Sequence, residues 1–167
     1  LLTLGLMTAF LLDPIFIIIL ICYYLLSLTY SVSLKRKIIL DICVLAGLYT
    51  MRIIAGGLAT SDEMSVWLLA FSMFFFLSLA AIKRQAELVS MSENKTHGGQ
   101  GRGYTVEDLP IISMIGLSSG YISVLVMALY INSPAVQKLY SYPYALYGIC
   151  CIVLYWLTRA TLITQRG

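Results

Sequence analysis

The chain alternates long apolar runs with short polar segments. The apolar runs cover residues 1–12, 14–30, 38–59, 65–81, 109–131 and 142–164. A helix of about 20 mostly apolar residues crosses the ~30 Å hydrocarbon core of a bilayer. The first run is too short for this, whereas the other five have the necessary length or nearly so. The pattern therefore predicts an all-α, polytopic transmembrane helix bundle with five full spans and one truncated span.

Turn-forming residues mark two of the predicted helix starts. Pro14 fits the first position of the span that begins there, because a helix needs no backbone N–H bond at that position. Before the fourth full span, Thr105 stands three residues ahead of Asp108 and Pro110 follows, which is typical of a capped helix start. The glycine-rich segment 97–104, "HGGQGRGY", is predicted to be a flexible loop.

The composition supports a membrane protein. Hydrophobic residues make up 60% of the chain and charged residues 11%, with a mean hydropathy of +0.89. Soluble globular domains are about half apolar and about a quarter charged, so this class is excluded. The sequence begins with Leu1 inside an apolar run and stops soon after another one. We therefore expect residues 1–167 to be a single transmembrane domain that is an internal piece of a longer protein, incomplete at both ends.

Basic residues gather at every second loop. The basic segments are "LKRK" at 34–37, the stretch 83–108, and the C-terminal end with Arg159 and Arg166. The intervening segment 60–64, "TSDEM", is acidic, and Asp13 falls on the same side of the predicted bundle. Cytoplasmic loops are enriched in Lys and Arg. We therefore predict an integral, multi-pass protein of a bacterial-type plasma membrane, with its basic loops in the cytoplasm.

Two charged residues lie inside the second full span. Asp41 and Arg52 are eleven positions apart, which places them on nearly the same helix face and ~16 Å apart along the axis. A charge at mid-bilayer costs at least ~2.5 kcal/mol, so each needs a partner or a watery cavity. Asp41 either pairs with Lys37 or faces a cavity. Arg52 either pairs with a carboxylate or carbonyl on another helix or contacts an anion in that cavity.

The basic segment 30–37, "YSVSLKRK", is the first candidate site. It places Tyr30 just before Lys35 and Arg36 at the predicted membrane surface. Ordinary positive-inside flanking accounts for the charge alone. A phosphate clamp is the functional alternative, because Lys acts as a point charge and Arg as a bidentate fork for phosphate oxygens.

The segment 83–88, "KRQAEL", is the second candidate site. Lys83 and Glu87 are four residues apart and share one helix face, with Arg84 a short rotation away. One interpretation is a salt bridge within the segment. The other is a magnesium–phosphate site in which Glu87 gives an oxygen to Mg²⁺ while the cations hold phosphates.

These segments together resemble one family. The stretches "YSVSLKRKIILDICVLAGLYTMRIIAGGLA" (30–59), "SVWLLAFSMFFFLSLAAIKRQAEL" (65–88) and "GRGY…EDLP" (101–110) are similar to UbiA-type intramembrane prenyltransferases. Within that family they look most like the polyprenyl-phosphate (decaprenyl-phosphate) phosphoribosyltransferase branch, which usually has Tyr where this chain has Gln85. The resemblance implies a bundle of nine helices around a central cavity, of which this chain would supply helices three to eight. The family's first acidic motif would precede Leu1.

The resemblance also implies a reaction and its residues. It assigns two groups: catalytic Glu87, Lys83 and Arg84, and phosphate-binding Lys35, Tyr30 and Arg36. Glu87 would help to bind Mg²⁺ at the diphosphate. The implied reaction is transfer of a phosphoribosyl group from phosphoribosyl diphosphate to a polyprenyl phosphate in the membrane lipid.

Two other functions stay open on the sequence. The first is a UbiA-type prenyltransferase that moves a polyprenyl group from its diphosphate onto an aromatic or lipid acceptor. The second is a transporter or a non-catalytic membrane protein, although a transporter would be expected to show inverted repeats and none is convincing here. No nucleic-acid partner is expected. The enzymatic functions require Lys35 and Glu87 to meet at one face of the membrane.

Overall fold

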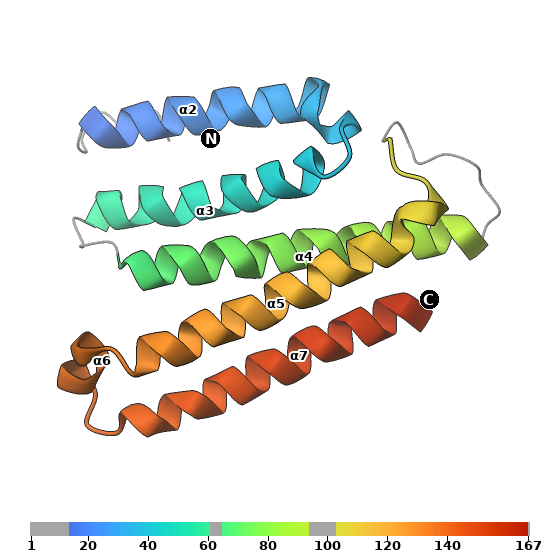
Figure 1. Ribbon diagram of the computed structural model, residues 1–167. Coiled ribbons are helices and arrows are strands. Elements are labelled where there is room, and N and C mark those ends of the chain that lie inside the picture. The colour runs from blue at the N-terminus through green and yellow to red at the C-terminus, as the bar shows by residue number, and fades with distance from the viewer. Residues whose placement is uncertain (1–13, 61–64, 94–102, 167) are drawn as a thin grey trace.

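Helices account for all regular structure in the part of the chain that the computed structural model describes, residues 14–60, 65–93 and 103–166 (Figure 1). The α-helices are α2 (Pro14–Val32), α3 (Leu40–Thr60), α4 (Val66–Glu93), α5 (Leu109–Ile131), α6 (Pro134–Leu139) and α7 (Tyr147–Arg166). Three short 3-10 helices connect them: η1 (Leu34–Arg36), η2 (Val106–Asp108) and η3 (Pro143–Leu146). Within the described residues, five helices are long and apolar enough to cross a membrane, which confirms the all-α transmembrane bundle.

The five long helices run alternately up and down, in the order α2, α3, α4, α5 and α7 (Figure 1). Helix α4 is the centre of the bundle, because it packs against α3, α5 and α7. Helix α2 lies at the edge, packs against α3, and contains no buried residue.

Small residues allow α4 and α5 to approach closely. The Ser78 hydroxyl on α4 donates to the Gly116 carbonyl on α5 at 2.7 Å. A Cβ at Gly120 would lie 2.9 Å from the Ser78 Oγ, so glycine is needed for this contact. Ala80 and Ala81 are buried beside them. Interfaces between membrane helices are typically built from such small residues, which let the backbones pack tightly.

The observed boundaries correct two predictions and confirm others. Helix α4 continues to Glu93 instead of ending near residue 81, because residues 82–93 contain no Gly or Pro to stop it. Helix α7 begins at Tyr147, five residues after the predicted start, because η3 precedes it. Helix α2 is described from Pro14 onward, and α5 spans the predicted 109–131.

The capped start before α5 is also confirmed. The carboxylate of Asp108 accepts a bond from the backbone N–H of Thr105 at 2.9 Å, and Pro110 stands in the first turn of α5. The predictions for residues 1–12, for Asp13 and for most of the loop 97–104 lie outside the described residues.

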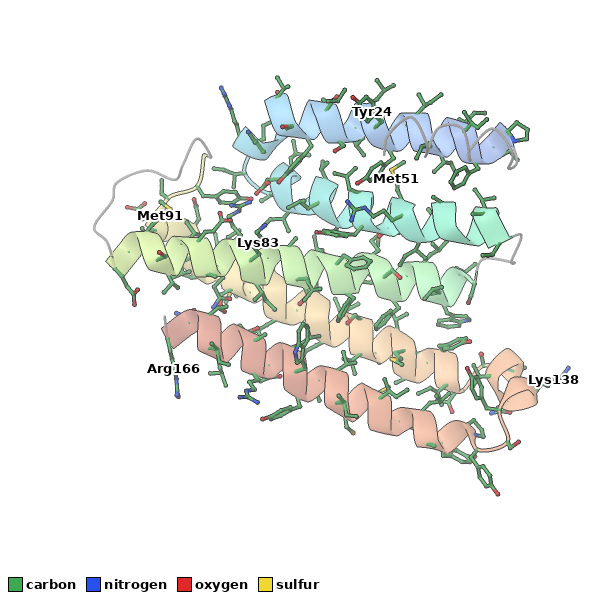
Figure 2. The ribbon with its side chains drawn as sticks, turned by 180° about the vertical axis from the view of Figure 1, so that it is seen from behind. Tyr24, Met51, Lys83, Met91, Lys138 and Arg166 are labelled. Atoms are coloured by element: carbon green, nitrogen blue, oxygen red, sulfur yellow. The ribbon has the colours of Figure 1, made fainter. Side chains whose placement is uncertain are left out.

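One end of the bundle collects η1, η2 and the C-terminal parts of α4 and α7, and we call it the site end. Figure 2 shows Lys83, Met91 and Arg166 toward this end, and Lys138 on α6 at the opposite end. The basic turn and the C-terminal end of α7 thus lie at one end, as the charge pattern predicted, whereas residues 61–64 of the acidic segment lie outside the described residues. Lys35 on η1 and Glu87 on α4 belong to the same end of the bundle, as the enzymatic functions require.

Candidate functional site

A buried arginine organises the site end. Arg84 is 3% exposed, and its two terminal nitrogens bond to two carboxylates, Nη2 to Asp41 and Nη1 to Glu87. Asp41 is fully buried in the first turn of α3, whereas the Glu87 side chain is 36% exposed. Arg84 and Glu87 are three residues apart on α4 and so share one helix face. The pair with Asp41 joins α3 to α4, whereas the pair with Glu87 lies within α4 and holds that carboxylate near the surface.

Tyr30 adds helix α2 to this cluster. Its hydroxyl donates to the Asp41 Oδ1 at 2.7 Å, so each oxygen of the buried carboxylate has a strong donor. Buried charges are stable when they are paired and hydrogen-bonded in this way. One of the two alternatives predicted for Asp41, an ion pair with Lys37, is wrong. The ionic partner of Asp41 is Arg84, 43 residues later.

Tyr104 covers the cluster from the segment before α5. Its side chain is 2% exposed, and its ring lies 5.2 Å from the Arg84 Cζ in a cation–π contact. Burial raises the pKa of the Tyr104 phenol, so the hydroxyl stays protonated at neutral pH. Tyr104 ends the "GRGY" segment, and no role was predicted for it from the sequence.

The Tyr104 hydroxyl also holds the basic turn between α2 and α3. It accepts the backbone N–H of Ile39 at 2.8 Å. Ile39 has a φ of 67°, a left-handed conformation that is unfavourable for a β-branched residue and needs support from its surroundings. A Cβ at Gly103 would lie 2.8 Å from the Arg36 carbonyl oxygen, so the two segments touch through their backbones.

The predicted phosphate-binding cations differ in exposure. The side chains of Arg36 and Lys83 are exposed and that of Lys35 is half-buried. Arg84, predicted as another phosphate contact, is instead buried and bonded to two carboxylates. Its position suits an internal counter-charge that orients Glu87. Of the predicted phosphate contacts, Lys35, Arg36 and Lys83 are therefore the cations accessible at the surface of the site end.

Arg52 lies apart from this cluster. Its Nε and Nη2 donate to the Tyr23 hydroxyl on α2 at 3.0 and 2.6 Å, and its Cζ lies 5.4 and 5.0 Å from the rings of Tyr23 and Tyr49. The sequence predicted a carboxylate or carbonyl partner, or an anion. Within the described residues the partner is instead the Tyr23 hydroxyl, and the guanidinium also contacts the rings of Tyr23 and Tyr49. Arg52 lies ~16 Å along α3 from Asp41 and does not contribute to the site end.

We predict that Tyr104→Phe loosens the basic turn without unfolding the bundle. The variant keeps the ring over Arg84 but removes the acceptor of the part-buried Ile39 N–H, and losing such a bond costs on the order of 1 kcal/mol or more. Amide hydrogen exchange of peptides covering residues 34–40 should become at least tenfold faster. Tyr142→Phe, at a side chain that is 82% exposed, is the control and should change nothing. Unchanged exchange in Tyr104→Phe would mean that the hydroxyl does not hold the turn.

Comparisons with known proteins find similarity over most of the chain to two proteins. No model of a known protein family matches it. An uncharacterized protein y4nM of Sinorhizobium fredii is 38% identical over 163 residues, which cover 97% of this chain and 32% of that protein. The nodulation protein NoeC of Azorhizobium caulinodans is 34% identical over 145 residues, 87% of this chain and 47% of NoeC. The chain therefore spans a third to a half of the length of these relatives.

A shorter match connects the chain to a named enzyme. Decaprenyl-phosphate phosphoribosyltransferase of Mycobacterium tuberculosis is 38% identical over 80 residues, which cover 48% of this chain and 26% of the enzyme. The protein of the same name from Mycolicibacterium smegmatis is 39% identical over 71 residues, 42% of this chain and 22% of that enzyme. Together with the five apolar helices, these similarities identify the chain as an integral membrane protein that shares sequence with a phosphoribosyltransferase over part of its length.

Proposed function

We propose that this chain forms part of a Mg²⁺-dependent, UbiA-type transferase that moves a phosphoribosyl group from phosphoribosyl diphosphate to a polyprenyl phosphate. The observation that carries the proposal is the meeting of Asp41, Arg84 and Glu87 with the basic turn at one end of the bundle. The partial identity to decaprenyl-phosphate phosphoribosyltransferases supports the same substrate class.

The charges at the site end suit an anionic leaving group. In the proposed reaction an oxygen of the polyprenyl phosphate forms a bond to the ribose C1, and the bond from C1 to diphosphate breaks. Negative charge then builds on the departing diphosphate, and fixed cations placed there stabilise it. Lys35, Arg36 and Lys83 are the residues proposed for this role. The isoprenoid tail of the acceptor stays in the hydrocarbon beside the apolar helices.

Arg84 has an indirect part in this proposal. Because it is buried and bonded to Asp41 and Glu87, it positions the Glu87 carboxylate toward the surface of the site end. Asp41 on α3 holds Arg84 in place, and Tyr30 on α2 hydrogen-bonds to Asp41 in turn. Lys35, Arg36, Lys83 and Glu87 are thus the groups that would touch substrate.

The described residues fit a magnesium ion that is bound mainly by its substrate. They contain no cluster of three or more His, Cys, Asp or Glu side chains. Mg²⁺ commonly uses one or two carboxylates and takes its other ligands from substrate phosphates and water. Glu87, with a part-exposed carboxylate beside Lys83, would hold such an ion. When bound, Mg²⁺ would neutralise charge on the diphosphate.

The proposal also fixes an orientation in the membrane. The site end carries the basic turn and the C-terminal part of α4, so the positive-inside rule assigns it to the cytoplasm. Phosphoribosyl diphosphate would then reach the site from the cytoplasm, while the polyprenyl phosphate arrives laterally in the inner leaflet.

A donor comparison with the full-length protein tests the reaction. The purified protein is incubated with Mg²⁺ and polyprenyl phosphate plus radiolabelled phosphoribosyl diphosphate, or with a radiolabelled prenyl diphosphate plus an aromatic acceptor. We expect label to enter the lipid phase from phosphoribosyl diphosphate only, and Lys138→Met, at the opposite end, to retain this activity. Transfer only from the prenyl diphosphate would support the prenyltransferase alternative. No transfer from either donor would reject a transferase.

A further inference from the structure

Arg52 stands near the middle of the membrane-spanning part of the protein. Its bonding partner Tyr23 is nine residues from each end of α2, and its ring partner Tyr49 is nine residues from the start of α3. At 1.5 Å per residue, each lies about 13 Å from the nearest helix end. The guanidinium that contacts both rings is therefore at a depth where water is absent unless a cavity admits it.

The described residues do not neutralise this charge. Nε and Nη2 of Arg52 share a single acceptor, the Tyr23 hydroxyl, although a guanidinium has five N–H donors. The rings of Tyr23 and Tyr49 offer only cation–π contact. The Arg52 side chain is exposed on the surface of α3, so it is accessible to lipid or to a further helix outside the described residues.

The surface around Arg52 has the features of a helix interface. Helix α2 contains no buried residue, and Figure 1 shows it at the edge of the row of helices, with α3 as its neighbour. Met51, next to Arg52, lies along the seam between α2 and α3 (Figure 2). Gly56, one turn beyond Arg52 on the same face, is exposed, and a Cβ there would meet nothing within 4 Å. Small residues at such a surface let a further membrane helix approach closely.

We propose that the face of α2 and α3 around Arg52 binds a further transmembrane helix that carries an Asp or Glu at mid-depth. A carboxylate is the group that pairs bidentately with a guanidinium, and ionisable side chains inside membranes usually pair with one another. A second copy of the described residues cannot supply it, because their acidic side chains all lie at the site end: Asp41, Glu87, Glu93, Glu107 and Asp108. The relatives are two to three times longer than the matched region, which leaves room for such a helix in the same polypeptide. This interface is independent of the proposed transferase reaction.

Double-mutant cycles in the full-length protein test the interface. Arg52→Met is combined, one at a time, with Asp→Asn or Glu→Gln at every acidic residue in the spans outside residues 14–166. We expect Arg52→Met to lower the thermal unfolding midpoint by several degrees, and one amide variant to lower it by a similar amount. That pair combined should be no less stable than either single variant, because both changes remove one ion pair. Lys138→Met, which removes an exposed cation from the opposite end, is the control and should leave the midpoint unchanged.

If the Arg52→Met protein does not accumulate in cells, a second experiment that swaps the two charges tests the same interface. Arg52→Glu combined with the partner acid changed to Arg should restore folded protein that Arg52→Glu alone loses. Additive effects with every acid, or an Arg52→Met protein as stable as the wild type, would overturn the proposal and indicate that a water-filled cavity or the tyrosine rings alone accommodate the charge. Neither outcome depends on transferase activity.

Discussion

Arg84→Met is expected to destabilise the protein by about 3 kcal/mol or more, the typical cost of breaking a buried ion pair from one side. The side chain of Arg84 is 3% exposed and that of its partner Asp41 is fully buried. Methionine fills much of the same volume but leaves the Asp41 carboxylate with the Tyr30 hydroxyl and no cation. The loss should appear as a lower unfolding midpoint of the full-length protein in detergent.

A second substitution separates the charge from the packing. Asp41→Asn added to Arg84→Met removes the uncompensated carboxylate and should recover a large part of the lost stability, because neutral polar groups are less costly to bury than charges. Arg159→Met, an exposed arginine on α7, should not lower the midpoint. If Arg84→Met is as stable as Arg159→Met, then Arg84 is not the element that holds α3 and α4 together at the site end.

The sequence predicted correctly those features that depend on long apolar runs and on the positions of charged loops. Apolar runs of sufficient length give the five spans, and alternation of basic and acidic loops gives the common end for Lys35 and Glu87. The spans depend on the contrast between hydrocarbon and water, which acts on composition alone. The common end follows because two spans, α3 and α4, separate Lys35 from Glu87. The continuation of α4 to Glu93 was within reach as well, because "QAELVSMSE" contains no residue that breaks a helix.

The roles of the two cations on α4 could not be predicted in this way. Lys83 and Arg84 are adjacent, so a rotation of the helix about its axis decides which of them faces α3 and which is exposed. Contacts of small residues fix that rotation, among them Ala81 and Ser78 against Gly116. Helix α4 is apolar on all sides within the span, so its sequence does not identify the packed face.

Tyr104 was missed for a related reason. It follows a glycine-rich segment without periodicity, and its hydrogen-bond partner Ile39 is 65 residues away. The contact exists only after α3, α4 and α5 have packed. A strained isoleucine cannot be recognised from the sequence either, since isoleucine gives no signal for a left-handed turn.

Glu87→Gln is expected to reduce turnover of the full-length protein by at least about 100-fold while leaving the fold intact. Removing one group that stabilises charge in a transition state typically costs 10²–10³ in rate. Glutamine keeps an oxygen that can accept the bond from Arg84, and Arg84 keeps its buried partner Asp41, so the unfolding midpoint should change little. The variant loses the negative charge that would hold Mg²⁺ at the diphosphate.

The magnesium dependence of this variant separates the proposed role from a structural one. If Glu87 binds the ion, residual activity of Glu87→Gln should need a higher Mg²⁺ concentration for half-saturation, whereas a merely structural role would leave that concentration unchanged. Glu93→Gln, at the exposed end of the same helix, is the matched control and should keep wild-type turnover. Wild-type turnover in Glu87→Gln would remove Glu87 from the site. The half-buried Lys35 and the exposed Arg36 and Lys83 would then be left to support the proposed chemistry without a carboxylate.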